Sequence, residues 1–452
     1  MGSIPQTQHV DALVVGAGVA GIYSTYQLTK SGLNVECIDT AGDVGGTWYW
    51  NTYPGAMSDT ESYLYRYSWD AEDLRSYPWS RHYVYQPEIL AYLKHVVKRH
   101  NLRQHMRFNT EMHTTTWDES ANRWIVECSN GIVYIARYLW HDSIRLKGMT
   151  VGIIGNGSTG VQVMTAIASK VGKLVSFQRH PQYSASSTAF SVPEVTRKTI
   201  EATPEERQAA FQDAFSDITT NREANEEACN FIRHKINGIV KDPKKAKALK
   251  PVDLYARRPL CDTGYYQIFN RENVDIIDLR ETLIESIEPE GIRTTEGSLH
   301  KLDVLIFATG FDAIDGSYLR INIRGRGGKT IKEHWSSGPT AYGAGAFANF
   351  PVVIESEINF IHDLILHGEK TGKSVEASEA AEESWNDVCN AAAEGSLFKT
   401  AASWVFGENV QGRKPSTKFY FGGLHQYRKW TQEQLESGLP GFVGEVPSAS
   451  RP

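Results

Sequence analysis

Two glycine-rich turns, each placed between a short apolar strand and a helix, constrain the fold of this 452-residue chain more than any other feature. The first turn, Gly-Ala-Gly-Val-Ala-Gly at 16–21, follows the apolar run 12–15. A helix to Lys30, a strand over 34–38 and Asp39 come next. Strand, turn, helix, strand and acid in this order form the dinucleotide-binding fingerprint in its required context. We therefore predict a Rossmann-like unit.

The residues of the first turn have separate physical roles in such a unit. Gly16 allows the tight turn, Gly18 lets the backbone approach a pyrophosphate, and Gly21 lets the helix pack closely on the strand. The N–H groups at the start of the helix bind phosphate oxygens. Asp39 is placed to bind ribose hydroxyls. The alternative is a glycine-rich turn in an unrelated α/β protein.

A second unit of the same kind begins near residue 147. The apolar strand 150–154 leads into Gly-Asn-Gly-Ser-Thr-Gly at 155–160, and a helix to Ala168 follows. The next strand, 173–177, ends in Gln-Arg-His without an acid. Arg179 at that place favours the 2′-phosphate of NADP over the free hydroxyl of NAD, whereas its alternative role is that of a solvated surface arginine.

Three further segments add to this pattern. Aromatic residues alternate with Gly and Pro from 45 to 55, which suits a rigid loop along a planar ring, although aromatic core filling is the alternative. The charged segment 191–250 favours a solvated helical insert or lid. The strand 303–307 ends in Ala-Thr-Gly, small residues that let the backbone approach a cofactor.

Composition excludes several classes of protein. There are 47 Lys and Arg against 53 Asp and Glu, a net charge of −6, so nothing attracts the chain to nucleic acid or anionic lipid. The five cysteines are scattered without a C-x-x-C pair, which argues against disulfides and against a metal site. Residues 1–11 lack a signal-peptide core, and no apolar run reaches membrane-spanning length. We expect a soluble, cytoplasmic protein that binds neither nucleic acid nor membranes.

With these motifs together, the sequence resembles the class B flavoprotein monooxygenases of the Baeyer–Villiger type over nearly its whole length. The resemblance rests on the two glycine turns, on Gly45 to Asn51, Tyr53 to Ala56 and Asp59 to Ser62, and on Gln178-Arg179, Arg257 to Leu260, Phe269 to Arg271 and Ala308 to Asp312. It implies an α/β fold with two Rossmann-like domains, one for FAD and one for NADP, and a helical insert.

The resemblance also implies roles for individual residues. Arg258 would stabilise the anionic flavin peroxide and the charged adduct with a ketone, and Asp59 would orient Arg258. FAD-binding residues would be Gly16, Gly18, Gly21, Asp39, Gly46, Thr47, Trp48, Trp50, Met57, Ser58, Asp59, Thr60, Tyr65 and Met112. NADPH-binding residues would be Gly155, Asn156, Gly157, Ser158, Thr159, Gly160, Arg179, His180 and Trp404.

The implied activity is an FAD- and NADPH-dependent monooxygenase that uses dioxygen to convert a ketone into an ester or lactone, with a ketone of secondary metabolism as the hypothetical substrate. N- or S-oxygenation on the same cofactors is an alternative. A non-oxygenating protein that retains the scaffold is another.

The chain departs from the family pattern in three places. A few dozen residues, including a small Ala-Thr-Gly strand, are absent near Trp140-His141, and a flavin-packing stretch is absent near Pro351. Met57-Ser58 replaces the usual Arg-Cys. A mis-joined gene model and a natural variant with lost or redirected chemistry both explain the gaps. The expected domains are 1–146 for FAD, 147–320 for NADP with the insert 191–250, and 321–452 completing the FAD domain.

Overall fold

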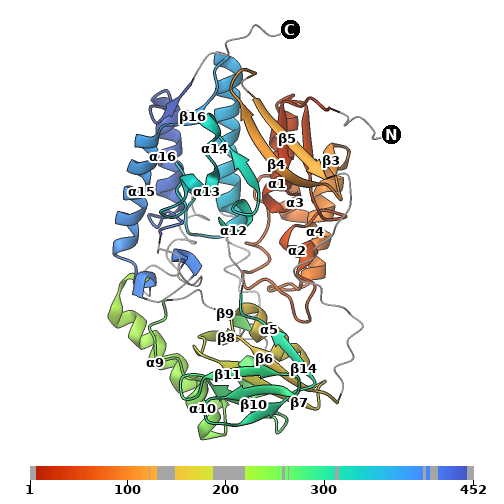
Figure 1. Ribbon diagram of the computed structural model, residues 1–452, viewed down its shortest axis with the longest axis vertical. Helices are drawn as coiled ribbons and strands as arrows, with labels where there is room; N and C mark the ends of the chain where they lie inside the picture. Colours follow the sequence, from red (N-terminus) through yellow and green to blue (C-terminus); the bar gives the residue numbers. More distant parts are fainter. Residues whose placement is uncertain are drawn as a thin grey trace.

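The computed structural model describes residues 7–121, 123–129, 148–186, 219–256, 260–262, 264–310, 315–400, 404–407 and 416–444. Its elements form two lobes, one above the other in Figure 1. The upper lobe combines the N-terminal strands and helices with the C-terminal helices, and the lower lobe contains the strands and helices from 148 to 310. The fold is α/β with Rossmann-like sheets, as the sequence predicts.

A parallel sheet in the order β1-β2-β3 contains the first fingerprint. It consists of β1 (Ala12–Val15), β2 (Val35–Ile38) and β3 (Met106–Arg107), and α1 (Val19–Lys30) connects β1 to β2. The predicted strand over 34–38 starts one residue later than expected. On its helical side, α1 and α4 (Gln86–Arg99) bury apolar and aromatic side chains in one core. This core fixes the first glycine turn at the carboxyl end of β1.

The lower lobe is built on a parallel sheet in the order β10-β7-β6-β14. The strands are β6 (Thr150–Ile154), β7 (Lys173–Gln178), β10 (Val274–Asp278) and β14 (Val304–Phe307), and α5 (Ser158–Ile167) follows β6. Apolar residues of α5 and these strands share one core with α9 (Arg222–Ile239) and α10 (Pro243–Leu249). The two helices lie in the predicted insert, of which 191–218 is outside the described residues.

The two sheets differ beside their first strand. β6 lies between β7 and β14, whereas β1 pairs only with β2 among the described residues. Val15, the last residue of β1, is 51% exposed. A Cβ on Gly155 would lie 2.4 Å from the backbone oxygen of Ala308 beyond β14, but one on Gly16 would meet no atom within 4 Å. Among the described strands, none therefore pairs with β1 on the side away from β2.

The remaining elements frame these two sheets. In the upper lobe they are α2 (Thr47–Trp50), α3 (Ala71–Ser76), η1 (Leu102–His105), β4 (Glu111–Asp118), β5 (Arg123–Ser129), α12 (Asp315–Tyr318), β15 (Asn322–Arg324), η3 (Arg326–Gly328), α13 (Ile331–His334), α14 (Phe350–Thr371), β16 (Glu376–Ala377), α15 (Glu379–Glu394), η4 (Leu397–Thr400), η5 (Trp404–Phe406), α16 (Leu424–Glu436) and β17 (Phe442–Val443). In the lower lobe they are β8 (Ser184–Ser186), β9 (Leu260–Asp262), α11 (Tyr265–Ile268), β11 (Ile284–Glu288), β12 (Gly291–Thr294) and β13 (Leu299–Lys301).

The long helix α14 joins the C-terminal third of the chain to the first fingerprint. It packs along α1, and the Tyr23 hydroxyl donates to Asn359 at 2.9 Å. The buried Glu355 carboxylate accepts hydrogen bonds from the backbone N–H of Ser68 at 2.6 Å and from its hydroxyl. Residues from both ends of the chain therefore support the helix that follows the first glycine turn. In the described residues, no helix is long and apolar enough to cross a membrane.

A second carboxylate of α14 makes stability depend on pH. Burial raises the pKa of Glu357 from 4.5 to about 7, although the Gly345 N–H donates to it. The folded state thus holds a proton that the unfolded chain releases, so the free energy of unfolding falls as pH rises from about 4.5 to 7. We expect Glu357→Gln to remove this pH dependence. At pH 8 its free energy of unfolding should exceed that of the parent by up to about 3 kcal/mol.

Denaturant unfolding between pH 5 and 8 at constant salt measures this difference. The exposed Glu436→Gln on α16 is the matched control, for which we expect the parent's pH profile. A Glu357→Gln variant whose unfolding free energy follows the parent at every pH would contradict the assignment.

Candidate active site

The first glycine turn depends on glycine for two different reasons, a left-handed backbone at Gly16 and close packing at Gly21. Gly16 has a φ of +102°, and a Cβ on Gly21 would lie 1.7 Å from the Gly16 backbone oxygen. The turn at Gly46 packs directly on it, since a Cβ on Gly46 would lie 2.8 Å from the Gly18 Cα. Two backbone segments therefore meet at the start of α1, where the helix N–H groups favour phosphate.

Asp39 lies at the tip of β2, as predicted, and is buried. Its Oδ2 accepts from the Ala17 N–H at 2.6 Å, and its Oδ1 accepts from the Ala41 N–H at 2.7 Å. These bonds fix the carboxylate against the glycine turn. Thr110, two residues before Met112, donates its N–H to the Asp39 backbone oxygen at 2.9 Å, so the start of β4 lies beside this tip.

The aromatic loop after β2 forms the short helix α2. Trp48 is buried, and its Nε1 donates to the Tyr65 hydroxyl at 3.1 Å with the two rings edge to face. Thr47 and Trp50 are exposed on the same helix. The structure thus brings together Trp48 and Tyr65, which the sequence analysis gives as FAD-binding residues, and Thr47 follows the Gly46 turn.

Asp59 lies in a segment that we call the Asp59 loop, residues 53–62. Met57 and Ser58 are buried in it, Met57 forms a β-bridge with Tyr85, and the Ser58 N–H donates to the Val84 oxygen at 3.0 Å. The Ser58 hydroxyl and the Thr60 backbone bond each other, which shapes the turn around Asp59. The N-terminal end of α4 therefore anchors one side of this loop.

The second glycine turn repeats the geometry of the first and is tied by a side chain to the next strand. Gly155 has a φ of +99°, and a Cβ on Gly160 would lie 2.3 Å from its oxygen. The Asn156 amide donates to Gln178 at 2.7 Å and to the His180 oxygen at 3.0 Å, which links the turn to the end of β7. Gly157 is the N-cap of α5, and Ser158 and Thr159 form its first turn.

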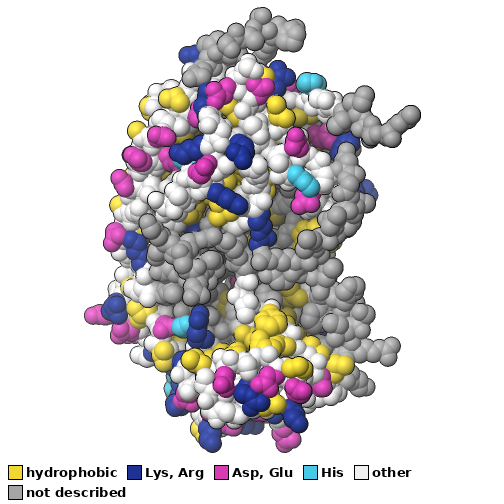
Figure 2. All heavy atoms as spheres, viewed as in Figure 1, with side chains coloured by type: hydrophobic (Ala, Val, Ile, Leu, Met, Phe, Trp, Pro, Cys, Tyr) yellow, Lys and Arg dark blue, Asp and Glu magenta, His cyan; other side chains and the backbone are white. Residues whose placement is uncertain are grey.

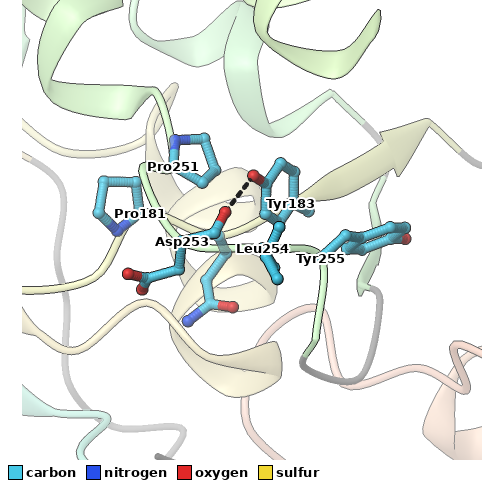
Figure 3. A pocket seen from close by; sticks show the side chains of 7 residues that line it. Pro181, Tyr183, Pro251, Asp253, Leu254 and Tyr255 are labelled. Atoms are coloured by element: carbon cyan, nitrogen blue, oxygen red, sulfur yellow. Dashed lines mark hydrogen bonds between the residues drawn. The ribbon is translucent and has the colours of Figure 1, made fainter. Parts of the chain in front are cut away.

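Arg179 is exposed at the end of β7, and His180 follows it with its ring 3.5 Å from the Asp253 carboxylate. The chain then lines a small pocket formed by Pro181, Gln182, Tyr183, Pro251, Asp253, Leu254 and Tyr255 (Figure 3). The Tyr183 hydroxyl donates to the backbone oxygen of Asp253 at 2.6 Å, so two lining residues are bonded to each other. Figure 2 shows hydrophobic side chains gathered on the lower lobe over β14, whose Phe307 is 57% exposed.

Two predicted residues cannot be placed. Arg258 lies outside the described residues, and so does the side chain of Trp404, whose backbone belongs to η5. The predicted gap at Trp140-His141 also falls outside them. The second predicted gap lies at the start of α14, where Asn349 donates to the Leu64 oxygen at 2.7 Å.

Sequence reasoning missed two buried glutamines, Gln162 on α5 and Gln178 on β7. The Gln178 amide bonds Asn156 and the Ala248 oxygen, and Gln162 bonds Tyr53 and Met57 of the Asp59 loop. A glutamine in an otherwise apolar helix stretch, Val161 to Met164, is the signal that could have indicated Gln162.

The residues present fit two dinucleotides. Each glycine turn forms a cradle that offers backbone N–H groups at a helix start, beside a glycine whose Cβ would clash with the backbone, Gly21 in the first and Gly160 in the second. An acid lies at the first cradle and an arginine at the second. Val15 is exposed at the end of β1, before the first cradle, and Phe307 is exposed at the end of β14, beside the second. Apolar side chains at such places are typical of the lining of a ligand site. No cluster of metal ligands occurs within the described part of the chain.

Comparison with known proteins agrees with this arrangement. A profile described as a NAD(P)-binding Rossmann-like domain matches residues 14–84. Cyclohexanone 1,2-monooxygenase of Acinetobacter sp is 38% identical, with 97% of each chain covered, and phenazine N-monooxygenase of Lysobacter antibioticus is 37% identical, with 96% and 97% covered. The closed crystal structure of cyclohexanone monooxygenase superposes with a TM-score of 0.88 at 37% identity, covering 98% of this chain and 100% of the other.

The alignment to the Acinetobacter enzyme spans 526 positions, more than the 452 residues of this chain, so the relative contains internal residues that this chain lacks. A structure of the Rhodococcus sp. Phi1 cyclohexanone monooxygenase with NADP+, with a TM-score of 0.87, covers 97% of this chain and 99% of the other at 38% identity. Similarity of this extent, on a scaffold with an FAD-type and an NADP-type cradle, shows that the chain belongs to the family of Baeyer–Villiger monooxygenases.

Proposed function

We propose that this chain inserts one atom of dioxygen beside the carbonyl of a ketone and gives an ester or lactone, with FAD on the first cradle and NADPH on the second. The observation that supports this most strongly is the pair of cradles with different strand tips, Asp39 at one and Arg179 at the other. Relatives named for ketone substrates, such as the acetone monooxygenase of Gordonia sp., support the substrate class.

When bound, a flavin reduced by NADPH supplies activated dioxygen to the ketone. The chain's own residues hold and shield that chemistry. The Gly18 and Gly46 backbones would approach the flavin nucleotide, Asp39 would bind its ribose, and Met112 would contact its adenine. Trp48 and Tyr65 border the ring site and exclude water from it. This border is completed by Gly46, Thr47, Trp50, Met57, Ser58 and Thr60.

The second cradle has the corresponding roles for NADPH. Asn156, Gly157, Ser158 and Thr159 bind its phosphates at the start of α5, and Arg179 with His180 binds the 2′-phosphate. As the family resemblance implies, Trp404 would cover the nucleotide. Arg258 would stabilise the negative charge that develops during oxygen insertion, and Asp59 would orient Arg258. The domain boundaries 1–146, 147–320 and 321–452 belong to the same proposal, supported by the contacts of α14 with α1. A cytoplasmic location is proposed from the free thiols Cys37, Cys128, Cys229 and Cys389.

The test is an oxygenation assay with purified protein reconstituted with FAD. We expect a flavin absorbance spectrum, NADPH oxidation that increases on addition of a cyclic ketone, and the lactone as product by mass spectrometry. Protein that binds no flavin and oxidises no NADPH would overturn the proposal in favour of a non-oxygenating scaffold.

N-oxygenation is a second candidate, because the phenazine N-monooxygenase is 37% identical over 96% of this chain. The same assay with a phenazine and with a thioether separates the candidates by product. An N-oxide formed faster than any lactone would favour this second function.

Arg179 provides a test of cofactor choice. Its exposed guanidinium at the end of β7 would bind a dianionic phosphate that NADH lacks. We expect Arg179→Ala to raise the KM for NADPH about 10–100-fold, as loss of a charge-assisted contact does, with kcat and the KM for NADH little changed. Steady-state kinetics with both nucleotides measures this split. An unchanged NADPH preference would place the 2′-phosphate elsewhere.

A further inference from the structure

The side-chain amide of Gln162 connects the two lobes through hydrogen bonds to the Asp59 loop. Gln162 is 4% exposed on α5, one turn after the second glycine cradle. Its Nε2 donates to the Met57 oxygen at 3.1 Å, and its Oε1 accepts from the Met57 N–H at 3.4 Å. The amide thus pairs with both backbone groups of one residue, much as a neighbouring strand would. This two-point contact fixes the register of Met57 as well as its distance from α5.

Tyr53 adds a third bond to the same amide. Its hydroxyl donates to the Gln162 Oε1 at 3.0 Å and accepts from the Thr159 hydroxyl at 3.4 Å, and Thr159 belongs to the second cradle. Burial raises the pKa of Tyr53, so the hydroxyl remains a proton donor at neutral pH. We call Gln162, Tyr53 and Met57 together the interlobe clamp.

The backbone of the Asp59 loop also packs closely against the backbone of α5. Gly55, between the two clamped residues, has a φ of +81°, and a Cβ on it would lie 2.6 Å from the Gln162 backbone oxygen. On its other side the Asp59 loop is bound to the upper lobe, since the Ser58 N–H donates to the Val84 oxygen and the Gln86 N–H donates to the Ala56 oxygen. A shift of α5 must therefore move the Asp59 loop with it.

From this geometry we infer that Gln162 is a positioning residue, which sets how the NADPH cradle faces the flavin site by clamping the Asp59 loop to α5. Gln162 itself contacts neither cofactor in this role. The inference rests on the proposed function, because the distance that it controls matters only if hydride passes between two nucleotides. A displacement of about 1 Å at such a distance is enough to cost about 100-fold in rate.

The experiment compares Gln162→Met with Tyr53→Phe, which removes only the hydroxyl. Gln162→Met keeps the volume and removes the three bonds of the clamp, together with a fourth bond from Gln162 Nε2 to the Ser158 hydroxyl at 3.4 Å within α5. Thr165→Val is the matched control on α5, because the Thr165 hydroxyl donates to the Val161 oxygen of its own helix. With FAD bound, stopped-flow absorbance follows flavin reduction at saturating NADPH. We expect at least a 10-fold slower reduction for Gln162→Met, a smaller loss for Tyr53→Phe and no change for the control, with dithionite reduction and NADP+ affinity little altered.

A second readout needs no cofactor. Hydrogen exchange of a peptide spanning 53–58, measured by mass spectrometry on the cofactor-free chain, should quicken in Gln162→Met relative to a peptide in α4. Normal NADPH reduction in a folded, flavin-loaded Gln162→Met variant would overturn the inference, and unchanged exchange would show that no clamp forms. If Gln162→Met does not fold, a Tyr53→Phe rate equal to that of the parent overturns it. A parent that never binds FAD contradicts the proposed function instead, and the exchange result still decides whether the clamp exists.

Discussion

Gly21→Ala is expected to abolish FAD binding while the lower lobe remains folded. The added Cβ would lie 1.7 Å from the Gly16 backbone oxygen and 2.8 Å from its carbon, far inside van der Waals contact. Neither atom belongs to a flexible side chain, so α1 must move away from β1 and carry the phosphate-binding N–H groups with it. Loss of backbone contacts to a diphosphate is expected to weaken FAD binding at least about 100-fold.

Flavin absorbance per protein after gel filtration measures this loss, and circular dichroism reports on folding. Gly238→Ala is the matched control: Gly238 lies in α9, and a Cβ there meets nothing within 4 Å. We expect that variant to hold FAD like the parent and to be slightly more stable, since alanine favours a helix over glycine by about 1 kcal/mol. Full flavin content in Gly21→Ala would show that the first cradle does not bind FAD.

The largest catalytic effect is expected from Arg258→Met. A single hydrogen-bond donor to the charge that develops in a transition state contributes a factor of about 10²–10³ in rate. A full positive charge in a site that excludes water contributes at least as much. We expect ketone oxygenation to fall at least about 1000-fold, whereas NADPH oxidation continues and releases hydrogen peroxide. Lactone and peroxide yields per NADPH, measured together, check this expectation.

Two controls define the role of the charge. Arg258→Lys keeps a cation but loses the planar fork, so we expect partial activity. Arg222→Met removes an exposed arginine whose Glu226 contact lies on the surface of α9, and it should not alter either yield. An Arg258→Met variant with the parent's lactone yield would remove Arg258 from the reaction.

Local sequence patterns predicted both nucleotide cradles because each depends on contacts within about 25 residues. The strands 12–15 and 150–154 agree with β1 and β6, and Asp39 lies at its predicted strand tip. The amphipathic pattern of the sequence covers only 355–366, whereas α14 extends further in both directions. Pro351 is tolerated in the first turn, and Gly372 ends the helix in a left-handed conformation.

Contacts between distant segments were harder to predict. Glu355 bonds Ser68, which is distant in the sequence, and Gln162 bonds Met57 across the two lobes. No local sequence pattern around Glu355 or Gln162 indicates these partners. Such pairs depend on how segments distant in sequence pack within a lobe or between the lobes, and the periodicity of a single sequence carries no information on that packing. The role of Arg258 came from family resemblance and not from any local pattern.

In the part of the chain that the structure describes, no strand pairs with β1 on the side away from β2, and its last residue, Val15, is exposed. An unpaired strand edge is a template to which an extended segment of a second molecule can add. Self-association through this strand would rise with protein concentration and would compete with nucleotide for the same carboxyl end of the sheet. Light scattering that falls when FAD is added would reveal that competition.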